Sequence, residues 1–586
     1  MNGAWKNWVL KPPQPEEAAR LAQSLGVSPV TAQLLLNRNQ NSLEQARAFL
    51  QPSLNDLHDP WGLPDAEKAA ARISEAVTRG ERIVVYGDYD VDGVTATALL
   101  VKCLRLMGAD VRYYVPDRME EGYGLNENAI RQITGEGAKL IITADCGVTA
   151  DVEIILARKL GADVIVTDHH EAGPHGRRVI ENAYAVVSAL REDSAYPFKG
   201  LSGVGVAFKL AWAIGKTLSG GRRCSPEFQD FLLDAVALVS LGTIADVVPL
   251  VGENRALASY GLGGLSCSEN PGLRALRRCA SVDGKGLTAF DVAFKLAPRI
   301  NAAGRLGTAL KVVEMLTTDS DEKAQEIALF LTSENARRQK IQEQILTQSL
   351  AMIAAGRPLD EMSALVLASP GWHPGVVGVV ASKLVERFHL PTVILCIDGD
   401  DAQGSARSVA GLHLFDALAE CDDLLRRYGG HALAAGLRLS AARIAEFRDK
   451  FLRIAAERMS PEDRIPKLAL DAEVPLSSLS LSLMGELNRL EPFGQGNPVP
   501  LFAAFELKVA GQVQRMGSKG SHLGFWVRQD DTALRAVAFG RGDMADKIQS
   551  AGLCSLAYRP NLNEYRGVKS LELRVEDIRL GPPRAE

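Results

Sequence analysis

Three aspartates stand at alternate positions directly after an apolar run, and they offer the clearest chemistry in the sequence. The apolar residues 83–86 are followed by Gly87-Asp88-Tyr89-Asp90-Val91-Asp92-Gly93. The apolar run predicts a buried strand. If the backbone after it stays extended, Asp88, Asp90 and Asp92 project to one side, because side chains in extended backbone alternate. Neighbouring carboxylates repel one another, so this spacing indicates a cation between them.

A calcium loop of the EF-hand type begins with the same pattern and is the first alternative. Such a loop needs a bidentate Glu at its twelfth position and a helix before its first. Counted from Asp88, the twelfth residue is Leu99, and the preceding segment is typical of a strand. The sequence therefore disfavours an EF-hand. A solvated acidic turn stays open for this stretch taken alone, because Asp and Gly are common in turns.

Two further β-rich runs end in the same kind of side chain. Residues 140–143 lead into Asp145-Cys146-Gly147, and residues 164–167 lead into Asp168-His169-His170. Helical patterns separate these runs, which predicts an α/β fold with a parallel sheet. Since the carboxyl ends of parallel strands share one edge, where ligands bind, we expect the three motifs to be neighbours.

A fourth candidate, Asp246, is the only charged residue between positions 235 and 250. An isolated carboxylate in an apolar run is costly to bury unless it is paired. For Asp246 taken alone, a role as metal ligand is as well supported as a role as helix cap or in a buried hydrogen bond. Together with the other motifs, the role as metal ligand is favoured. Cys146, beside Asp145, suggests a thiol nucleophile, but no partner base is evident, so a packing role is favoured.

Composition limits the class of protein. With 586 residues, we expect three or four domains. The 46% hydrophobic and 23% charged content and the net charge of -5 are those of an ordinary soluble protein without a globally basic surface. Eight cysteines without a CxxC pair indicate neither a zinc site nor a disulfide framework. A signal segment and an apolar run of about eighteen residues are not found, so we expect a cytoplasmic protein with no membrane contact.

Together, the ordered motifs resemble those of the DHH phosphoesterase superfamily and, within it, the RecJ single-strand-specific exonucleases. The resemblance covers most of the chain. Besides residues 87–93, Asp145-Cys146-Gly147 and Asp168-His169-His170, it rests on Gly242–Leu250, Pro298–Gly307, Trp372–Gly378, Gly404–Ser408, Gly429–Gly436 and Glu491–Pro498. One departure is Ala185–Leu190, which lacks the Asn-Pro that the family has after this apolar run.

The resemblance implies a metal-dependent active site. It assigns ligand and catalytic roles to Asp90, Asp92, Asp145, His169, His170 and Asp246. Asp168 is expected to orient its neighbours, and Asp88 to be either a ligand or such a partner. Carboxylate and imidazole ligands without thiolates suit two Mn²⁺ or Mg²⁺ ions.

By the same resemblance, a second group of residues is expected to bind substrate. Gly404–Ser408 combines small residues with hydroxyls and one guanidinium, a combination suited to phosphate. A packed turn with an exposed arginine is the open alternative for this segment. The expected substrate-binding residues are Arg118, Arg299, Asn301, Arg305, Ser405, Arg407 and His431.

The chain divides into five expected segments. They are a helical lead-in (1–60), a DHH catalytic domain (61–318), a connecting helix (319–358), a smaller α/β DHH-associated domain (359–460), and a linker with an OB-like barrel (461–586). Asp319 is expected to cap the connecting helix, with Glu322 completing a capping box. On that helix, residues 337–340 (Arg-Arg-Gln-Lys) are interpreted as a solvated face rather than a DNA contact.

The barrel is predicted from short alternating runs after Leu501. This part has 13 Lys and Arg against 10 Asp and Glu, the reverse of the whole chain. Its aromatic and basic residues are candidates for stacking bases and holding phosphates, although a place in the barrel core is expected for about half of the aromatics. These residues are Phe525, Trp526, Tyr558 and Tyr565, with Arg528, Arg559 and Arg566.

The implied function is a two-metal exonuclease that degrades single-stranded DNA from a 5' end in repair and recombination. A single-strand-binding protein or a helicase is an expected partner. A phosphodiesterase for short oligonucleotides or cyclic dinucleotides is the alternative within enzymes. A non-catalytic DNA-binding adaptor is the alternative outside them, and the complete ligand set argues against it.

Overall fold

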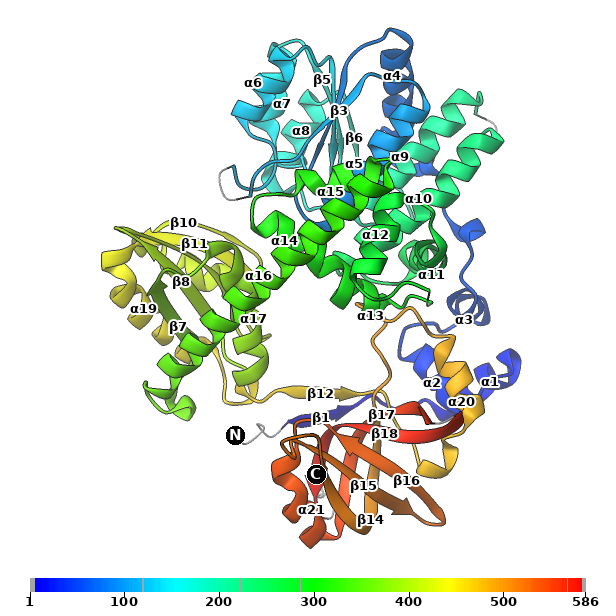
Figure 1. Ribbon diagram of the computed structural model, residues 1–586, viewed down its shortest axis with the longest axis vertical. Coiled ribbons are helices and arrows are strands. Elements are labelled where there is room, and N and C mark those ends of the chain that lie inside the picture. Colours follow the sequence, from blue (N-terminus) through cyan, green and yellow to red (C-terminus); the bar gives the residue numbers. More distant parts are fainter. Residues whose placement is uncertain (1–5, 119–120, 222, 285, 566, 582–586) are drawn as a thin grey trace.

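The computed structural model describes residues 6–118, 121–221, 223–284, 286–565 and 567–581. Figure 1 shows a large α/β body at the top, a smaller α/β body on the left and a β-barrel below. The long helix α16 (Asp321–Ala354) connects the two α/β bodies. The predicted fold class is confirmed.

The large body is built on a five-stranded sheet in which every neighbouring pair is parallel. Its order is β3-β2-β4-β5-β6. The chain leaves β2 for β3 on one side and then crosses to β4 on the other, so the order reverses between β2 and β4. Such a switch point is where ligands bind in open parallel sheets. The strands are β2 (Ile83–Gly87), β3 (Val111–Tyr114), β4 (Leu140–Ala144), β5 (Asp163–Thr167) and β6 (Ala185–Val187).

Helices cover both faces of this sheet. Val85 and Ile142 share a core with α4 and α5, whereas Val84 and Ile141 share one with α6, α7 and α8. Because both faces are buried, the strands are continuously apolar, which is the pattern of a parallel sheet. The helices are α4 (Ala66–Thr78), α5 (Val91–Leu106), α6 (Glu127–Gly135), α7 (Asp151–Lys159) and α8 (Gly176–Asn182).

A helical layer completes the large body, with α9 and α10 packed against α5. It contains α9 (Gly203–Leu218), α10 (Pro226–Ala245), α11 (Gly252–Cys267), α12 (Pro271–Cys279), α13 (Ala289–Asp291), a π-helical turn (Val292–Leu296), α14 (Ala297–Arg305) and α15 (Leu310–Thr317). Among the described helices, α10 is long and apolar enough to cross a membrane, but 61% of its most apolar window is buried inside the protein, as in a core helix. The expectation of no such stretch missed α10 because three acidic residues interrupt it.

The smaller body has a mixed sheet of order β10-β11-β9-β8-β7, in which only β7 and β8 are parallel. Its strands are β7 (Leu365–Pro370), β8 (Thr392–Asp398), β9 (Asp401–Arg407), β10 (Leu425–Gly430) and β11 (Ala434–Ser440). Its helices are α17 (Pro374–Phe388), α18 (Leu414–Ala419) and α19 (Ile444–Arg458). The expected cap of the connecting helix is wrong by one residue, since Ser320, not Asp319, accepts the Lys323 N–H.

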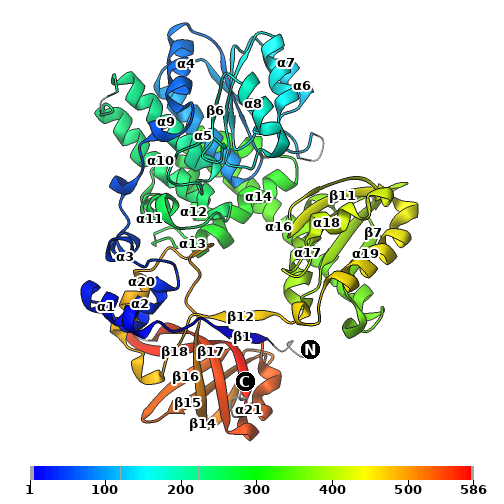
Figure 2. The ribbon, with the colours of Figure 1, turned by 180° about the vertical axis from the view of Figure 1, so that it is seen from behind.

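The barrel closes because β17 pairs with both β18 and β14. Its five strands are β14 (Phe502–Met516), β15 (His522–Gln529), β16 (Thr532–Ala538), β18 (Val568–Leu580) and β17 (Leu553–Tyr565), in spatial order. The N-terminal helices α1 (Pro15–Leu25), α2 (Pro29–Leu36) and α3 (Leu43–Leu50) share its hydrophobic core, as does α20 (Leu481–Asn488). In Figures 1 and 2, the first and last parts of the chain accordingly lie side by side.

The joint between barrel and large body is fixed by hydrogen bonds at its centre. The buried guanidinium of Arg255 on α11 donates to the carbonyls of Phe49, at the end of α3, and of Leu490 and Glu491, just after α20. Helix C-termini carry unpaired carbonyls and partial negative charge, which a cation satisfies. The N-terminal β1 (Asn7–Leu10) also pairs with β12 (Lys467–Leu470), the strand that leads into the barrel.

Candidate active site

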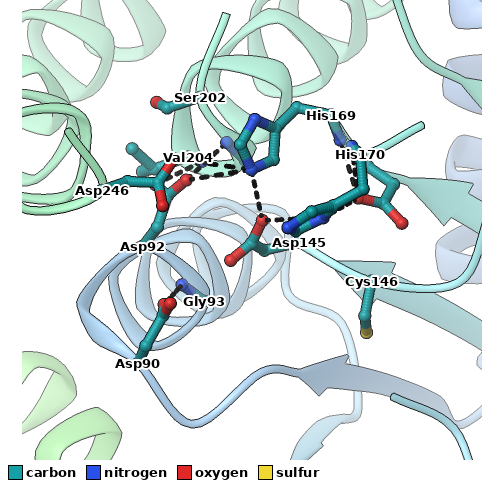
Figure 3. A network of polar contacts seen from close by, with 12 residues as sticks. Asp90, Asp92, Gly93, Asp145, Cys146, His169, His170, Ser202, Val204 and Asp246 are labelled. Atoms are coloured by element: carbon teal, nitrogen blue, oxygen red, sulfur yellow. Dashed lines mark hydrogen bonds and ion pairs between the residues drawn. The ribbon is translucent and has the colours of Figure 1, made fainter. Parts of the chain in front are cut away.

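Carboxylates and imidazoles gather at the carboxyl edge of the parallel sheet (Figure 3). Asp88 and Asp90 follow β2, Asp145 follows β4, and the Asp168-His169-His170 run follows β5. Asp246 comes from another element, the C-terminal end of α10. We call the side chains of Asp88, Asp90, Asp92, Asp145, Asp246, His169 and His170 the acidic cluster.

The backbone after Asp90 is helical, so the expectation of an extended segment there is wrong. Asp90 caps α5, and its carboxylate accepts the Gly93 N–H at 3.0 Å. Asp92 therefore lies in the first helical turn, where its buried carboxylate accepts the N–H groups of Gly203 at 2.6 Å and Val204 at 2.9 Å. These groups form the N-terminus of α9, whose dipole favours an anion. Gly93 is required there, because a Cβ would lie 2.6 Å from the Asp88 carbonyl oxygen.

His169 lies between three carboxylates. Its Nε2 is 3.1 Å from Asp145 Oδ1, 3.6 Å from Asp246 Oδ2 and 3.9 Å from Asp92 Oδ2. His169 Nε2, Asp145 Oδ1 and Asp88 Oδ1 are all buried, and none has a hydrogen-bond partner among the described residues. Buried polar atoms in native proteins nearly always have a partner, so these three atoms indicate a ligand.

The electrostatics of the cluster indicate that this ligand is a cation. Burial and the charges of Asp246 and Asp90 raise the pKa of Asp92 well above its ordinary value. Burial and neighbouring carboxylates likewise raise the pKa values of Asp88 and Asp145. For Asp246, burial and Asp90 raise the pKa to about 7. Ionising all of these groups together is therefore unfavourable unless positive charge is bound among them.

The side chains fall into overlapping sets with the spacing of metal ligands. These sets are Asp145, His169 and His170; Asp92, His169 and Asp246; and Asp88, Asp90 and Asp145. Burial and the charge of His170 lower the pKa of His169 to about 4, so its ring is neutral and can offer a lone pair. The donor set of oxygens and imidazole nitrogens without thiolates fits Mn²⁺ or Mg²⁺.

Asp168 supports the cluster without facing into it. Its carboxylate accepts the N–H groups of Val148, His169 and His170 and lies 2.8 Å from His170 Nδ1. Although burial opposes ionisation, the hydrogen bond and charge of His170 lower the pKa of Asp168. Burial disfavours the charged ring of His170, but Asp168 outweighs it and raises the pKa of His170 to about 9. Asp168 thus fixes the ring orientation of His170, as carboxylates beside metal-binding histidines do.

Cys146 is fully buried in the core behind the site. Its Sγ lies 3.7 Å from the Tyr86 carbonyl oxygen, and burial and Asp168 raise its pKa well above the ordinary value. The thiol therefore stays protonated, as expected of a packing residue and not of a nucleophile.

Four arginines form a second cluster beside the first. Arg118 follows β3, Arg305 ends α14, Arg338 lies on α16 and Arg407 ends β9. We call these four residues the arginine cluster. Burial, together with the charges of the other three, lowers the pKa of Arg305 to about 10, and burial and Arg118 lower that of Arg407. Arg118 also acts on Asp88, so the two clusters adjoin.

Cationic side chains whose charges lower one another's pKa indicate that an anion binds among them. The backbone of α17 lies close to this cluster. Arg305 donates to the Gly375 carbonyl at 3.0 Å, and Arg407 to its neighbour Ala406 at 2.8 Å. A Cβ on Gly378 of α17 would lie 3.1 Å from Arg407 Nη2 and 3.2 Å from Ser405 Oγ. Ser405 and Arg407 therefore point to the same side of β9, as alternate residues of a strand do.

The structure links the remaining predicted substrate residues less directly to the arginine cluster. His431 is exposed in the hairpin between β10 and β11, where its backbone N–H donates to Ala434. Asn301 lies half-buried on α14, one turn before Arg305. Arg299 is not brought to the arginine cluster, because its guanidinium donates to the carbonyls of Cys279, at 3.2 Å, and Lys295.

Arg338 is the member of the arginine cluster that was not among the predicted site residues. The run 337–340 was its only sequence signal, and a solvated face was favoured there. In the structure, Arg338 is half-buried, burial lowers its pKa, and its guanidinium donates to Asn335 and Gln342. The signal was too weak because helical spacing alone does not show which face of α16 meets the other bodies.

Comparison with known proteins gives a consistent set of relatives. Residues 82–238 match the DHH family N-terminal domain, 361–457 the DHHA1 domain and 470–577 the RecJ OB domain. The Bacillus subtilis single-stranded-DNA-specific exonuclease RecJ is 38% identical over 97% of this chain and 70% of its own length. The Escherichia coli protein of the same name is 34% identical over 96% of this chain and 97% of its own length.

Solved structures agree. The crystal structure of RecJ in complex with Mn²⁺ from Thermus thermophilus matches with a TM-score of 0.83 and 34% identity, over 99% of this chain and 80% of that one. The Mg²⁺ complex from the same organism matches with a TM-score of 0.78 and 33% identity, over 99% and 79%.

Proposed function

The chain belongs to the RecJ family of single-stranded-DNA-specific exonucleases, and we propose that it removes nucleotides from the 5' end of a single strand with two bound divalent cations. It is a metal-dependent exonuclease. The observation that supports the 5' polarity and the site assignment is that the two clusters adjoin: the Arg118 guanidinium lies 5.1 Å from the centroid of the Tyr89 ring, between Asp88 and Asp90 in the chain, and its charge acts on Asp88. The acidic cluster would bind cations, and the arginine cluster beside it would bind an anion.

The acidic cluster would hold the cations through Asp90, Asp92, Asp145, His169, His170 and Asp246, with Asp88 at its edge. When bound, two Mn²⁺ or Mg²⁺ ions activate water and stabilise the charge that develops on the phosphate. The protein fixes the ligands in advance. The α9 N–H groups orient Asp92, and Asp168, 2.8 Å from His170 Nδ1, fixes the orientation of the His170 ring.

The arginine cluster would hold the 5'-terminal phosphate. A terminal phosphate is a dianion, so several guanidiniums bind it more strongly than they bind the monoanion of a phosphodiester. Arg118, Arg305, Arg338 and Arg407 supply charge and fork-shaped donors, and the Ser405 hydroxyl supplies a further donor. A strand anchored here by its terminal phosphate would present its first phosphodiester bond to the acidic cluster. This arrangement supports cleavage from the 5' end.

The barrel supports a long strand as substrate over a cyclic dinucleotide. On β15, Trp526 (51% exposed) and Arg528 face outward, whereas Phe525 and Val527 are buried. Tyr558 is also buried and donates to the Val474 carbonyl. Two of the four predicted aromatics are thus core residues. The side chain of Tyr565 and all of Arg566 lie outside the described residues.

The proposed substrate also suggests the proteins that would act together with this enzyme. Because duplex ends must be unwound before a single-strand enzyme acts, a helicase or a single-strand-binding protein is the expected partner, in the cytoplasm, in repair and recombination.

One assay tests the proposal. A strand of about 30 nucleotides, labelled at either end and carrying a 5'-phosphate or 5'-hydroxyl, is incubated with Mn²⁺ or with a chelator. We expect mononucleotides to be released from the 5' end, faster for the phosphorylated strand, no cleavage with chelator, and no cleavage of blunt duplex. Release from the 3' end would refute the assigned polarity. Binding without cleavage would favour the adaptor, and cleavage restricted to di- and trinucleotides would favour the small-substrate phosphodiesterase.

A further inference from the structure

Two phenylalanines stand on the surface of the large body without cover among the described residues. Phe290 and Phe294 are 62% and 67% exposed. Their ring centroids are 4.6 Å apart and their planes are inclined by 31°. Paired exposed aromatics are unfavourable in water and commonly mark a binding surface. Neither residue contributes to the acidic or arginine cluster.

The backbone beneath the pair is built to be rigid. Thr288 and Asp291 form a capping box, and Asp291 also pairs with Lys295 at 2.6 Å. Pro298 has no N–H to continue the α-helical ladder, and the Ala297 N–H bonds to the Val292 carbonyl in a π-helical turn. Arg299 donates to the Lys295 carbonyl. Arg299, which was predicted to bind substrate, therefore has its guanidinium engaged by the π-helical turn in this structure.

The turn stands beside elements of the active site. It packs against α10, which ends at Asp246, and it continues directly into α14, which ends at Arg305. Figures 1 and 2 both show α13 on the side of the large body that faces the barrel. Eleven helical steps separate Phe294 from Arg305, about 16 Å along the axis, which is the reach of a few nucleotides.

We propose that Phe290 and Phe294 form a base-stacking step that guides the strand between the barrel and the active site. The proposal rests on the proposed function, and continuity with the arginine cluster through α14 identifies the occupant as the same strand. Aromatic rings stack on any base, so the step suits an enzyme that must pass every sequence. The pair is uncharged and therefore adds affinity without adding salt dependence.

The test compares strands of different lengths in the double variant F290A/F294A. In the presence of chelator, to prevent cleavage, the Kd for a strand of about 20 nucleotides should rise about 10- to 100-fold, the range of base–aromatic stacking. Hydrolysis of dinucleotides with Mn²⁺ should stay at the parent rate, because they do not reach the pair. Dinucleotide turnover also reports the proposed function by itself, so failure there is distinguishable from failure of the stacking step.

Two further variants separate stacking from folding and from general apolar contact. F290Y/F294Y should keep the parent affinity, whereas F290L/F294L should lose most of it, although both keep a large side chain. Y260A, which removes a 49% exposed aromatic from α11 of the same body, is the matched control and should bind normally. A strand with 2-aminopurine a few nucleotides from its 5' end should show quenched fluorescence with the parent protein and recovered fluorescence with F290A/F294A.

An unchanged Kd for the long strand in F290A/F294A would overturn the proposal. So would equal behaviour of the Leu and Tyr variants. A change in oligomeric state on size-exclusion chromatography, with DNA affinity intact, would show instead that the pair is a protein-binding surface.

Discussion

The acidic cluster gathers negative charge and the arginine cluster gathers positive charge, and the two are built from different parts of the molecule. Every acidic-cluster ligand lies in the large body, and most follow directly from strand ends of one sheet. The arginine cluster draws Arg118 and Arg305 from that body, Arg338 from the connecting helix and Arg407 from the smaller body. In both, like charges are brought together beyond what the protein itself neutralises.

This difference in construction indicates that the acidic cluster serves the chemical step and the arginine cluster serves recognition of the strand end. The acidic cluster is fixed within one body, mostly by the strand ends of a single sheet, so it can place reacting atoms with the precision that catalysis requires. The arginine cluster depends on how two bodies sit across α16, so it suits recognition of a terminus that must enter and leave. Variants of the acidic cluster should therefore abolish chemistry for every substrate. Variants of the arginine cluster should change the preference for a 5'-phosphate over a 5'-hydroxyl.

The largest expected effect is the loss of a shared ligand. D145A should reduce turnover by at least about 10³-fold on phosphorylated and hydroxyl strands alike, because several kcal/mol of transition-state stabilisation depend on the cations. Steady-state kinetics on both strands, with circular dichroism to verify folding, measures this. C146A, at the next position but outside the cluster, is the control. Near-normal turnover in D145A would contradict the ligand assignment.

A smaller loss is expected when the support of a ligand is removed. D168N keeps shape but not charge, so His170 loses the partner that fixes its proton and ring. We expect metal affinity and turnover to fall about 10- to 100-fold, as for other groups that orient metal-binding residues. Isothermal titration with Mn²⁺ measures the affinity. An effect on turnover that saturating Mn²⁺ leaves entirely unrelieved would indicate that Asp168 contacts substrate.

R407A tests the role of the arginine cluster. It should lower the preference for a 5'-phosphate over a 5'-hydroxyl about 10- to 100-fold, roughly 1.5–3 kcal/mol for a charge-assisted contact. Turnover of the hydroxyl strand should change little. R427A removes an exposed arginine from β10 of the same body and should leave the preference intact. Equal loss on both strands would show that Arg407 serves chemistry and not end recognition.

The smallest effect is a pH dependence of stability in the metal-free protein. The folded pKa of Asp246 is about 7, above its ordinary value of 3.8, so its contribution is fully present below about pH 4 and is lost as pH rises through 7. His170 acts in the same direction, with a pKa raised from 6.5 to about 9. His169, whose pKa is lowered to about 4, acts in the opposite direction up to about pH 6.5, but the combined loss from Asp246 and His170 is larger. With chelator, Tm should therefore fall by several degrees between pH 5 and 9.

Added Mn²⁺ should reverse this fall, because it binds only the folded protein and offsets the repulsion. D246N should show a shallower fall than the parent. Differential scanning calorimetry with and without Mn²⁺ measures both, and a Tm of the metal-free protein that rises with pH would contradict the charge balance assigned to the acidic cluster.

The sequence predicts the acidic cluster far better than the arginine cluster, for a physical reason. Asp88, Asp145 and Asp168 follow apolar strands, and parallel topology alone brings strand ends together. The detail depended on tertiary structure. Asp92 is oriented by a helix that starts more than a hundred residues later, and the helix begins at Val91, where extended backbone was expected.

Residues assembled across bodies leave little local signal. Arg338 and Arg299 look alike in sequence, yet one joins the arginine cluster and the other holds a carbonyl of the π-helical turn. On β15, successive side chains point to opposite faces of the strand, so Trp526 faces outward and its neighbour Phe525 faces the core. The N-terminal lead-in gave no sign that it shares a core with the barrel, so deleting the barrel would expose α1–α3. Single surface variants such as W526A are the cleaner test of strand binding.

One measurement tests most directly whether the two clusters form a single site. Crystals grown with Mn²⁺ and a 5'-phosphorylated, phosphorothioate-linked oligonucleotide would be measured for anomalous scattering from manganese and sulfur. We expect two manganese peaks among Asp90, Asp92, Asp145, His169, His170 and Asp246, with the terminal phosphate within hydrogen-bonding distance of Arg407 and Arg118. Manganese bound elsewhere, or a terminal phosphate remote from the arginine cluster while the strand occupies the site, would contradict this expectation.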